Sequence, residues 1–133
     1  MTDPFPELDP TARRTVQGFL DLALNHSAEG MAELFAKDCE FIGALTAGKL
    51  RGRKVVEAHY RQVFRGYLPT RVTVLQGAQI QGRQIVFDWE IQDAKDAAFV
   101  PAPGRTTIAL DDFGLIASIK TEWSPRQARE GRR

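Results

Sequence analysis

The spacing of apolar residues changes once along the chain, near residue 68, and this change restricts the folds that the chain can adopt. Before this point, apolar side chains recur every three or four residues, which is typical of amphipathic helices. After it, they alternate with polar residues, which is typical of strands with one buried face. Helices followed by a run of hairpin-linked strands favour an α+β fold, with a mostly antiparallel sheet and the helices on one face.

Three helices are expected before residue 68. Asp9 is placed to cap the first helix, and Pro10 fits its first position. Ser27 would cap a short second helix that turns Met31, Leu34 and Phe35 inward. The face of the first helix would carry Ala12, Val16, Phe19, Leu20 and Ala23.

The third helix, residues 53–67, has the clearest helical pattern in the chain. At 100° per residue its apolar positions fall within one arc of about 180°. Pro69 ends it, because a residue before proline disfavours the helical conformation. The arc contains Val55, Val56, His59, Tyr60, Val63, Phe64 and Tyr67.

Five strands complete the expected sheet, with a further short strand at 98–100. They are residues 39–42, a segment from residue 71 on which Val72 and Val74 alternate with polar neighbours, 85–91, 105–110 and 115–123. Alternation places Phe87 and Trp89 on one face and Asp88 and Glu90 on the other. In the last strand it likewise separates Ile119, Thr121 and Trp123 from Lys120 and Glu122. We therefore interpret the acidic residues as outward-facing, either solvated or at a dimer interface.

Composition and charge remove several classes of protein. With 133 residues the chain favours one domain, and it contains neither an apolar run long enough for a membrane span nor a secretory signal, so we expect a cytoplasmic protein. Four arginines lie at 126–133, which leaves 14 basic against 16 acidic residues elsewhere, so nucleic-acid binding is not expected. The single cysteine, Cys39, is interpreted as a small buried hydrophobe. One cysteine and two distant histidines offer no metal-ligand spacing, and no metal or cofactor is expected.

The chain resembles a SnoaL-like domain of the nuclear-transport-factor-2-like superfamily. Five segments carry the resemblance, in family order: VQGFLDLALN (16–25), MAELFAKDCEF (31–41), LRGRKVVEAHYRQVF (50–64), RQIVFDWEI (83–91) and IALDDFGLIASIKTEW (108–123). The resemblance implies a cone in which a curved sheet wraps about three helices and encloses a pocket. It also implies relatives that include ketosteroid isomerases, polyketide cyclases, hydrolases, dehydratases and noncatalytic domains, many of them homodimers. We divide the chain accordingly into an irregular lead-in (1–9), the domain (10–125) and a disordered basic tail (126–133).

The catalytic residues of two of these relatives do not carry over. Ketosteroid isomerases use a carboxylate base and an oxyanion hole made of a tyrosine and a protonated aspartic acid. The matching positions hold Gly43 for the base, Phe19 for the tyrosine and Thr106 for the acid. The epoxide hydrolases of the superfamily pair an Arg-x-Asp with a second aspartate, but here the arginine is missing before Asp88 and Thr121 stands near the second acid.

The resemblance and the helical face lead to two hypotheses about function. In the first, the chain is an isomerase, cyclase or dehydratase of an apolar ring-containing molecule, with Tyr60 and His59 as candidate catalytic residues. In the second, it is a noncatalytic module for ligand binding or dimerisation. The inward aromatic rings either line an apolar cavity or simply fill the core. A homodimer would form through the outer face of the sheet. The expected ligand pocket is Val16, Phe19, Phe41, His59, Tyr60, Phe64, Phe87, Trp89, Ile119, Thr121 and Trp123.

Overall fold

Two helices, one short 3-10 helix and a six-stranded sheet make up residues 8–43 and 48–123, the part of the chain that the computed structural model describes. The helical elements are α1 (Pro10–Leu24), η1 (Met31–Leu34) and α2 (Arg53–Arg65). The strands are β1 (Phe35–Ile42), β2 (Lys49–Arg51), β3 (Arg71–Gln81), β4 (Gln84–Asp93), β5 (Ala102–Leu110) and β6 (Ile116–Trp123). Most of the predicted lead-in (1–7) and all of the predicted tail (126–133) lie outside the described residues.

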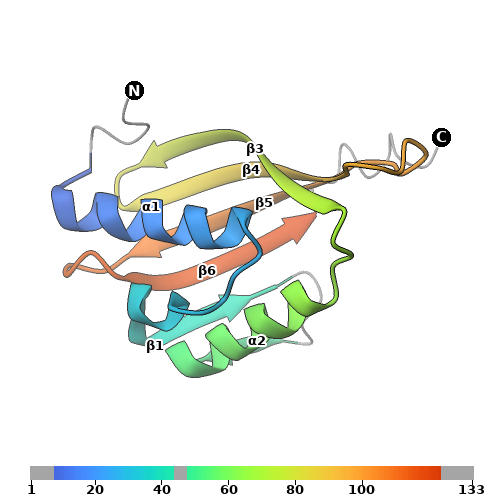
Figure 1. The fold of residues 1–133 in the computed structure, drawn as a ribbon. Coiled ribbons are helices and arrows are strands. Elements are labelled where there is room, and N and C mark those ends of the chain that lie inside the picture. The colour runs from blue at the N-terminus through green and yellow to red at the C-terminus, as the bar shows by residue number, and fades with distance from the viewer. Residues whose placement is uncertain (1–7, 44–47, 124–133) are drawn as a thin grey trace.

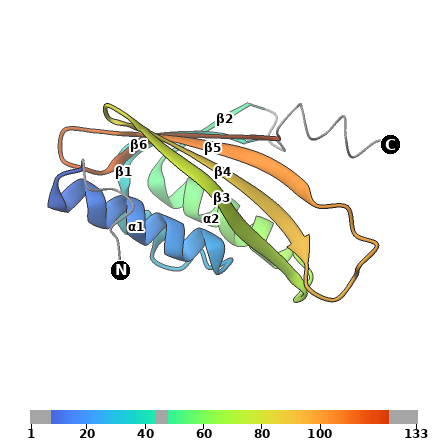
Figure 2. The same ribbon diagram turned by 90° about the horizontal axis from the view of Figure 1, so that it is seen from above.

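The sheet is curved, and both helices lie against its concave face (Figures 1 and 2). Its strand order is β2-β1-β6-β5-β4-β3, and the pairing is antiparallel everywhere except between β1 and β6. The expected α+β class and mostly antiparallel sheet are confirmed. The expected number of helices is too high by one, because the second segment makes only a four-residue 3-10 turn.

Local residues determine where α1 begins. The Asp9 side chain accepts a hydrogen bond from the Ala12 amide at 2.8 Å, and Pro10 occupies the first turn, where no amide donor is needed. The predicted apolar face is the face that packs inward, since Ala12, Val16, Phe19 and Leu20 are all buried.

The prediction for the second helix is wrong at both ends. Ser27 caps nothing; η1 follows Gly30, whose φ of 91° turns the chain in a way that suits glycine. Phe35, predicted to be helical, begins β1 and pairs with Ile116 of β6. Phe35 is fully buried, so tertiary pairing and burial override the local helical pattern.

The predicted short strand at 98–100 is also wrong. These residues belong to the connection between β4 and β5, whose amides are bonded to the side chains of Asp93 and Asp96. Instead, β5 begins earlier than expected, at Ala102. It includes Pro103, which pairs only with Glu90 because β6 ends opposite Gly104. On that free edge proline removes no sheet hydrogen bond.

The core lies between α1, η1 and the sheet. Its largest fully buried side chains include Phe35, Met31, Phe87 and Ile85. The expectation that Cys39 is a buried hydrophobe is confirmed, because only 1% of the residue is exposed. The predicted orientation of β4 is likewise confirmed: Phe87 is buried, whereas Asp88 forms an ion pair with Arg105 on the other face at 2.7 Å.

Candidate functional site

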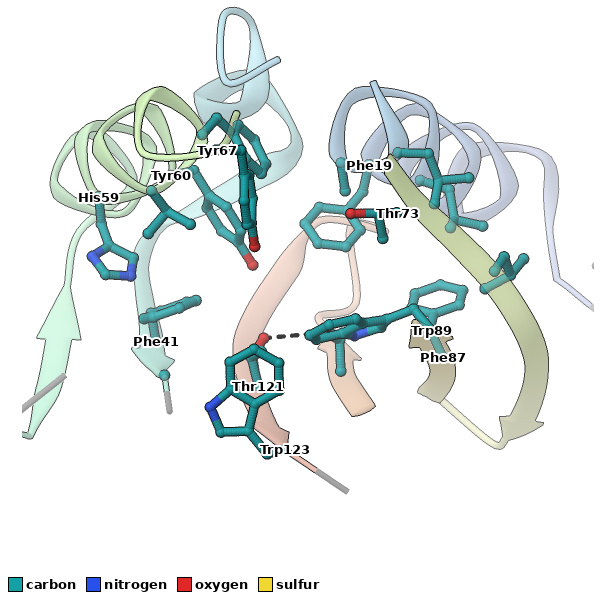
Figure 3. A pocket seen from close by; sticks show the side chains of 18 residues that line it. Phe19, Phe41, His59, Tyr60, Tyr67, Thr73, Phe87, Trp89, Thr121 and Trp123 are labelled. Atoms are coloured by element: carbon teal, nitrogen blue, oxygen red, sulfur yellow. Dashed lines mark hydrogen bonds between the residues drawn. The ribbon is translucent and has the colours of Figure 1, made fainter. Parts of the chain in front are cut away.

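A cavity of about 130 Å³ lies between the two helices and the concave face of the sheet (Figure 3). Its wall is almost entirely apolar, and none of the described residues that line it carries a formal charge at neutral pH when its histidine is neutral. The lining residues are Phe19, Leu20, Ala23, Leu24, Phe41, Gly43, His59, Tyr60, Val63, Phe64, Tyr67, Thr73, Leu75, Phe87, Trp89, Thr106, Thr121 and Trp123.

Nine of the eleven residues predicted for the pocket line this cavity. The other two, Val16 and Ile119, do not, because they are fully packed in the adjacent core, with 0% and 2% exposure. Val16 lies one helical turn before Phe19, and Ile119 lies two residues before Thr121. Sequence periodicity places each on the correct face but does not show how far along that face the cavity extends.

One face of α2 provides most of the aromatic wall. His59, Tyr60 and Phe64 project from the helix, and Tyr67 follows directly after its C-cap. The Tyr60 ring contacts Phe41 edge-on at a centroid distance of 5.4 Å and Phe19 at 6.1 Å. Such edge-to-face contacts are favourable and fix the orientation of the ring. Val55, which was predicted for the same face, is instead 50% exposed because it lies at its margin, in the first turn of the helix.

A chain of polar groups crosses the sheet side of the cavity. The Trp89 indole donates a hydrogen bond to Thr106 Oγ1 at 2.9 Å, and Thr106 Oγ1 lies 3.1 Å from Thr121 Oγ1. Thr106 and Thr121 are directly opposite each other on β5 and β6. Burial raises the pKa of Tyr60 far above its ordinary value. Hydrogen bonding from Thr121 only partly opposes this effect, so the phenol keeps its proton at all physiological pH values.

His59 lies on the cavity wall with its ring 4.7 Å from that of Phe41, measured between centroids. Partial burial lowers the pKa of this histidine, so the imidazole is neutral at pH 7. Among the described residues its ring nitrogens have no hydrogen-bond partner. A neutral imidazole in this position can accept a proton from a bound molecule.

A histidine in a loop between two predicted helices is expected to be solvated, but His26 is partly buried. Its Nε2 lies 2.7 Å from Thr73 Oγ1, and its ring stacks on Tyr67 at 4.6 Å and on Phe64 at 5.5 Å. The backbone adopts a positive φ of 53°, which is uncommon outside glycine and asparagine. His26 therefore closes the α1 end of the aromatic wall, and the contact with β3, 47 residues away, has no signal in the local sequence.

The orientation of β3 was also predicted incorrectly. Thr73 and Leu75 line the cavity, whereas Val72 is 38% exposed. A register shift between Leu75 and Gly77 marks a β-bulge in this strand, and a bulge changes which residues face inward. Of the lining residues that were not predicted, Ala23, Val63 and Tyr67 could have been found, because they belong to the apolar faces predicted for the first and third helices, although Tyr67 lies just beyond the end of α2.

The three positions that the isomerase resemblance marks as catalytic all line the cavity, as Phe19, Gly43 and Thr106. None of them can accept a proton as a carboxylate would. The carboxylates of Asp88, Glu90 and Glu122 are not among the described lining residues. No group of three or more potential metal ligands occurs within residues 8–43 and 48–123. Within the same residues, no helix has the length and hydropathy of a membrane span.

A family model described as "SnoaL-like domain" matches residues 16–119. No curated protein sequence matches the chain. Among solved structures, a steroid delta-isomerase from Pseudomonas aeruginosa has a TM-score of 0.73 and 17% identity, covering 93% of this chain and 87% of that one. A protein named as a candidate SnoaL-like polyketide cyclase, from Jannaschia sp. CCS1, has a TM-score of 0.69 and 17% identity, covering 93% and 94%. An NTF2-like protein of unknown function from Mesorhizobium loti has a TM-score of 0.70 and 16% identity, covering 93% and 97%. At these identities the likeness shows the fold alone.

Proposed function

Because the chain belongs to the SnoaL-like domain family, whose model matches residues 16–119, we propose that its cavity binds a small, largely apolar, ring-containing molecule. The observation that supports this most directly is the composition of the wall: aromatic and aliphatic side chains surround the space, and a few hydroxyl groups and one imidazole interrupt them. Small-molecule sites in proteins usually have this composition. The names of the structural relatives, an isomerase and a candidate cyclase, agree with a ligand of this kind.

The size of the cavity limits the ligand. A volume of about 130 Å³ is close to that of an engineered cavity of about 150 Å³ that holds benzene. Pockets for drug-sized ligands are larger, about 300–1,000 Å³. In the conformation described here, the cavity therefore accommodates one six-membered ring with a small substituent.

Proton transfer by His59 is a second candidate function. Its neutral imidazole lines the cavity and is the described lining group best suited to act as a base near neutral pH. In this version the protein isomerises, cyclises or dehydrates its ligand, with Tyr60 orienting the oxygen atom of the substrate. If the protein does not convert its ligand, the same cavity serves a noncatalytic binding module.

Intrinsic fluorescence tests the binding proposal, because both Trp89 and Trp123 line the cavity. We expect one-ring apolar compounds to change the emission in a saturable manner. Replacement of Ala23, which lines the cavity from α1, by leucine should fill the space and weaken binding by about 10-fold or more. The matched control is Ala58→Leu, on the exposed side of α2, which should bind as the wild type does. A panel that produces no saturable change, or an unchanged affinity in Ala23→Leu, would contradict the assignment.

Turnover tests the second candidate. If His59 transfers a proton, His59→Gln should slow the conversion of a bound substrate by roughly 10²–10⁴-fold. The affinity of the variant for that substrate should stay within a few-fold of the wild-type value. Saturable binding by the wild type, without conversion of any compound in the panel, would favour the noncatalytic module.

We also propose that two copies pair through the outer face of the sheet. This face carries both signs of charge, including Glu40, Lys120 and Glu122, together with the 40% exposed Ile42. A two-fold interface requires one surface to complement itself, and mixed charges allow this. Ala109→Arg, near the end of β5 and beside these residues on the outer face, should lower the sedimentation coefficient to that of a monomer, whereas Ala94→Arg in the β4–β5 connection should not. A wild-type protein that sediments as a monomer at high concentration would refute the pairing.

A further inference from the structure

Two tyrosine side chains, Tyr60 and Tyr67, line the same cavity. Tyr60 projects from α2, and Tyr67 follows directly after the C-cap of this helix, Gly66. Figure 3 shows both hydroxyls directed toward the same part of the space between the helices and the sheet. The charge of either phenolate would also raise the pKa of the other, and Tyr67 is a cause of the raised pKa of Tyr60.

Neighbouring rings hold both tyrosines in place. The Tyr60 ring packs between Phe19, Phe41 and Phe64, at centroid distances of 5.4–6.1 Å. The Tyr67 ring stacks on His26 at 4.6 Å. The His26 ring is fixed in turn by the hydrogen bond between its Nε2 and Thr73 Oγ1. The two hydroxyls therefore sit on a rigid support before any ligand binds, which reduces the entropy lost on binding.

The polar chain leaves the hydrogen of the Tyr60 hydroxyl available. Trp89 donates to Thr106, and a second hydrogen bond joins Thr106 and Thr121. Thr121 lowers the pKa of Tyr60, which is the effect of a hydroxyl that donates toward the phenol oxygen. The Tyr60 hydrogen is therefore not used by this chain and can be donated to a ligand.

Tyr67 supplies a second free hydrogen. Within the described residues its hydroxyl forms no hydrogen bond. Burial raises the pKa of this tyrosine, so it is a protonated donor at neutral pH. The hydroxyl of Thr73 is not equivalent, because His26 already engages it.

We propose that the hydroxyls of Tyr60 and Tyr67 together bind a single acceptor oxygen on a neutral ligand, of the kind found in a cyclic ketone, while the ring of the ligand lies against the aromatic wall. This inference rests on the proposed function, and it specifies the chemical class of the ligand. A carboxylate ligand is disfavoured, because no lysine or arginine is among the described lining residues to pair with it. A hydrocarbon is disfavoured as well, because it would leave two partly buried donors unsatisfied.

Two probes of the same shape test the proposal: cyclohexanone, and methylenecyclohexane, in which a CH₂ group replaces the oxygen. We would measure both dissociation constants by titration calorimetry or NMR for the wild type, Tyr60→Phe and Tyr67→Phe. The quantity compared is the preference for the ketone, which is the methylenecyclohexane constant divided by the cyclohexanone constant. Because each protein is compared with itself, a general loosening of the cavity cancels from this ratio.

We expect each Tyr→Phe substitution to lower the ketone preference by about 2- to 10-fold, as for loss of one neutral hydrogen bond. Thr107→Val removes a hydroxyl from the opposite face of β5 and should leave the ratio unchanged. The carbonyl stretching frequency of bound cyclohexanone provides a second measurement: it should lie below the value in an alkane solvent and rise in Tyr67→Phe. This measurement stands even if Tyr60→Phe does not fold.

The outcomes separate the two proposals. If the wild type binds both probes and neither tyrosine substitution changes the ketone preference, the two-tyrosine site is wrong, whereas the apolar cavity remains a binding site. If the wild type binds neither probe, the proposed function fails for single-ring ligands, and the oxygen site fails with it.

Discussion

The six-membered ring of the Trp89 indole lies directly over Gly104, its partner on the adjacent strand, so closely that a β-carbon on Gly104 would come within 2.3 Å of the Trp89 ring. Gly104 is buried, so the contact cannot be relieved toward solvent. The indole can therefore lie flat over β5 and donate to Thr106 only because this position has no side chain.

Gly104→Ala should displace the Trp89 indole. We expect a loss of stability of about 1–3 kcal/mol, as for other overpacked sites, together with a shift in tryptophan emission. Gly77→Ala is the matched control, since a β-carbon there would meet nothing within 4 Å. Urea unfolding followed by fluorescence measures both effects. Equal stabilities for the two variants would show that the indole can move at no cost.

Asp93 should make stability depend on pH in strongly acidic solution. Hydrogen bonds from the amides of Lys95 and Asp96, at 2.9 and 2.8 Å, lower the pKa of its carboxyl to about 2, with further contributions from Thr70 and Arg71. A carboxyl with a lowered pKa stabilises the fold fully above its unfolded value of about 3.9, and this stabilisation is lost as the pH falls toward 2.

Asp93→Asn should therefore be clearly less stable than the wild type at pH 7, and the difference should shrink between pH 4 and pH 2. Urea unfolding at pH 7, 4, 3 and 2 measures it. Asp88→Asn serves as a control, because the ion pair of Asp88 with Arg105 is exposed, and such pairs contribute about 0–1 kcal/mol. A difference for Asp93→Asn that stays constant across this range would refute the assignment.

The two histidines should produce a separate loss of stability at milder pH. Burial lowers the pKa of both His26 and His59. A base whose pKa is lowered by folding binds more protons when the protein is unfolded, so stability should fall as the pH drops below about 6.5. His26→Asn and His59→Gln should each flatten the slope of unfolding free energy against pH between 7 and 5. The histidine ring signals in NMR titrations should give the pKa values of His26 and His59 directly. Midpoints at or above about 6.5 would show that folding does not lower these pKa values.

Cys39 should react only when the protein unfolds. Burial is the main cause that raises the pKa of this thiol, so the folded protein contains little of the reactive thiolate. The residue is also only 1% exposed, so a reagent cannot reach the sulfur. Labelling by an aromatic disulfide reagent in the native buffer should be far slower than in urea. Its rate should increase in destabilised variants such as Gly104→Ala. Rapid labelling of the native protein would mean that β1 opens locally.

The sequence-based predictions succeeded where adjacent residues decide the structure. Asp9 and Pro10 specify the beginning of α1 by themselves, and alternation along β4 correctly separates Phe87 from Asp88. Prediction failed where a distant partner decides. Phe35 belongs to a strand because it pairs with Ile116. His26 is partly buried because its imidazole bonds to Thr73 and stacks on Tyr67.

The same distinction applies to the candidate site. The aromatic face of α2 could be predicted from helical spacing, because every residue on it belongs to one element. The inward turn of Thr73 could not, since it depends on the bulge in β3. The polar chain from Trp89 to Thr121 joins three strands, and only the register of β4, β5 and β6 brings its members together.

The parallel pairing of β1 with β6 has a consequence for how the chain folds. Towards the centre of the sheet, β1 pairs with β6, the last strand in the chain; the paired residues Phe41 and Ile119 are roughly 80 positions apart. During synthesis, β1 therefore has β2 and the helical elements η1 and α2 as its main partners until β6 has been made. The domain cannot close until the ribosome has released β6. Contacts between segments so distant also slow folding, so β6 should set the pace at which newly made copies become native.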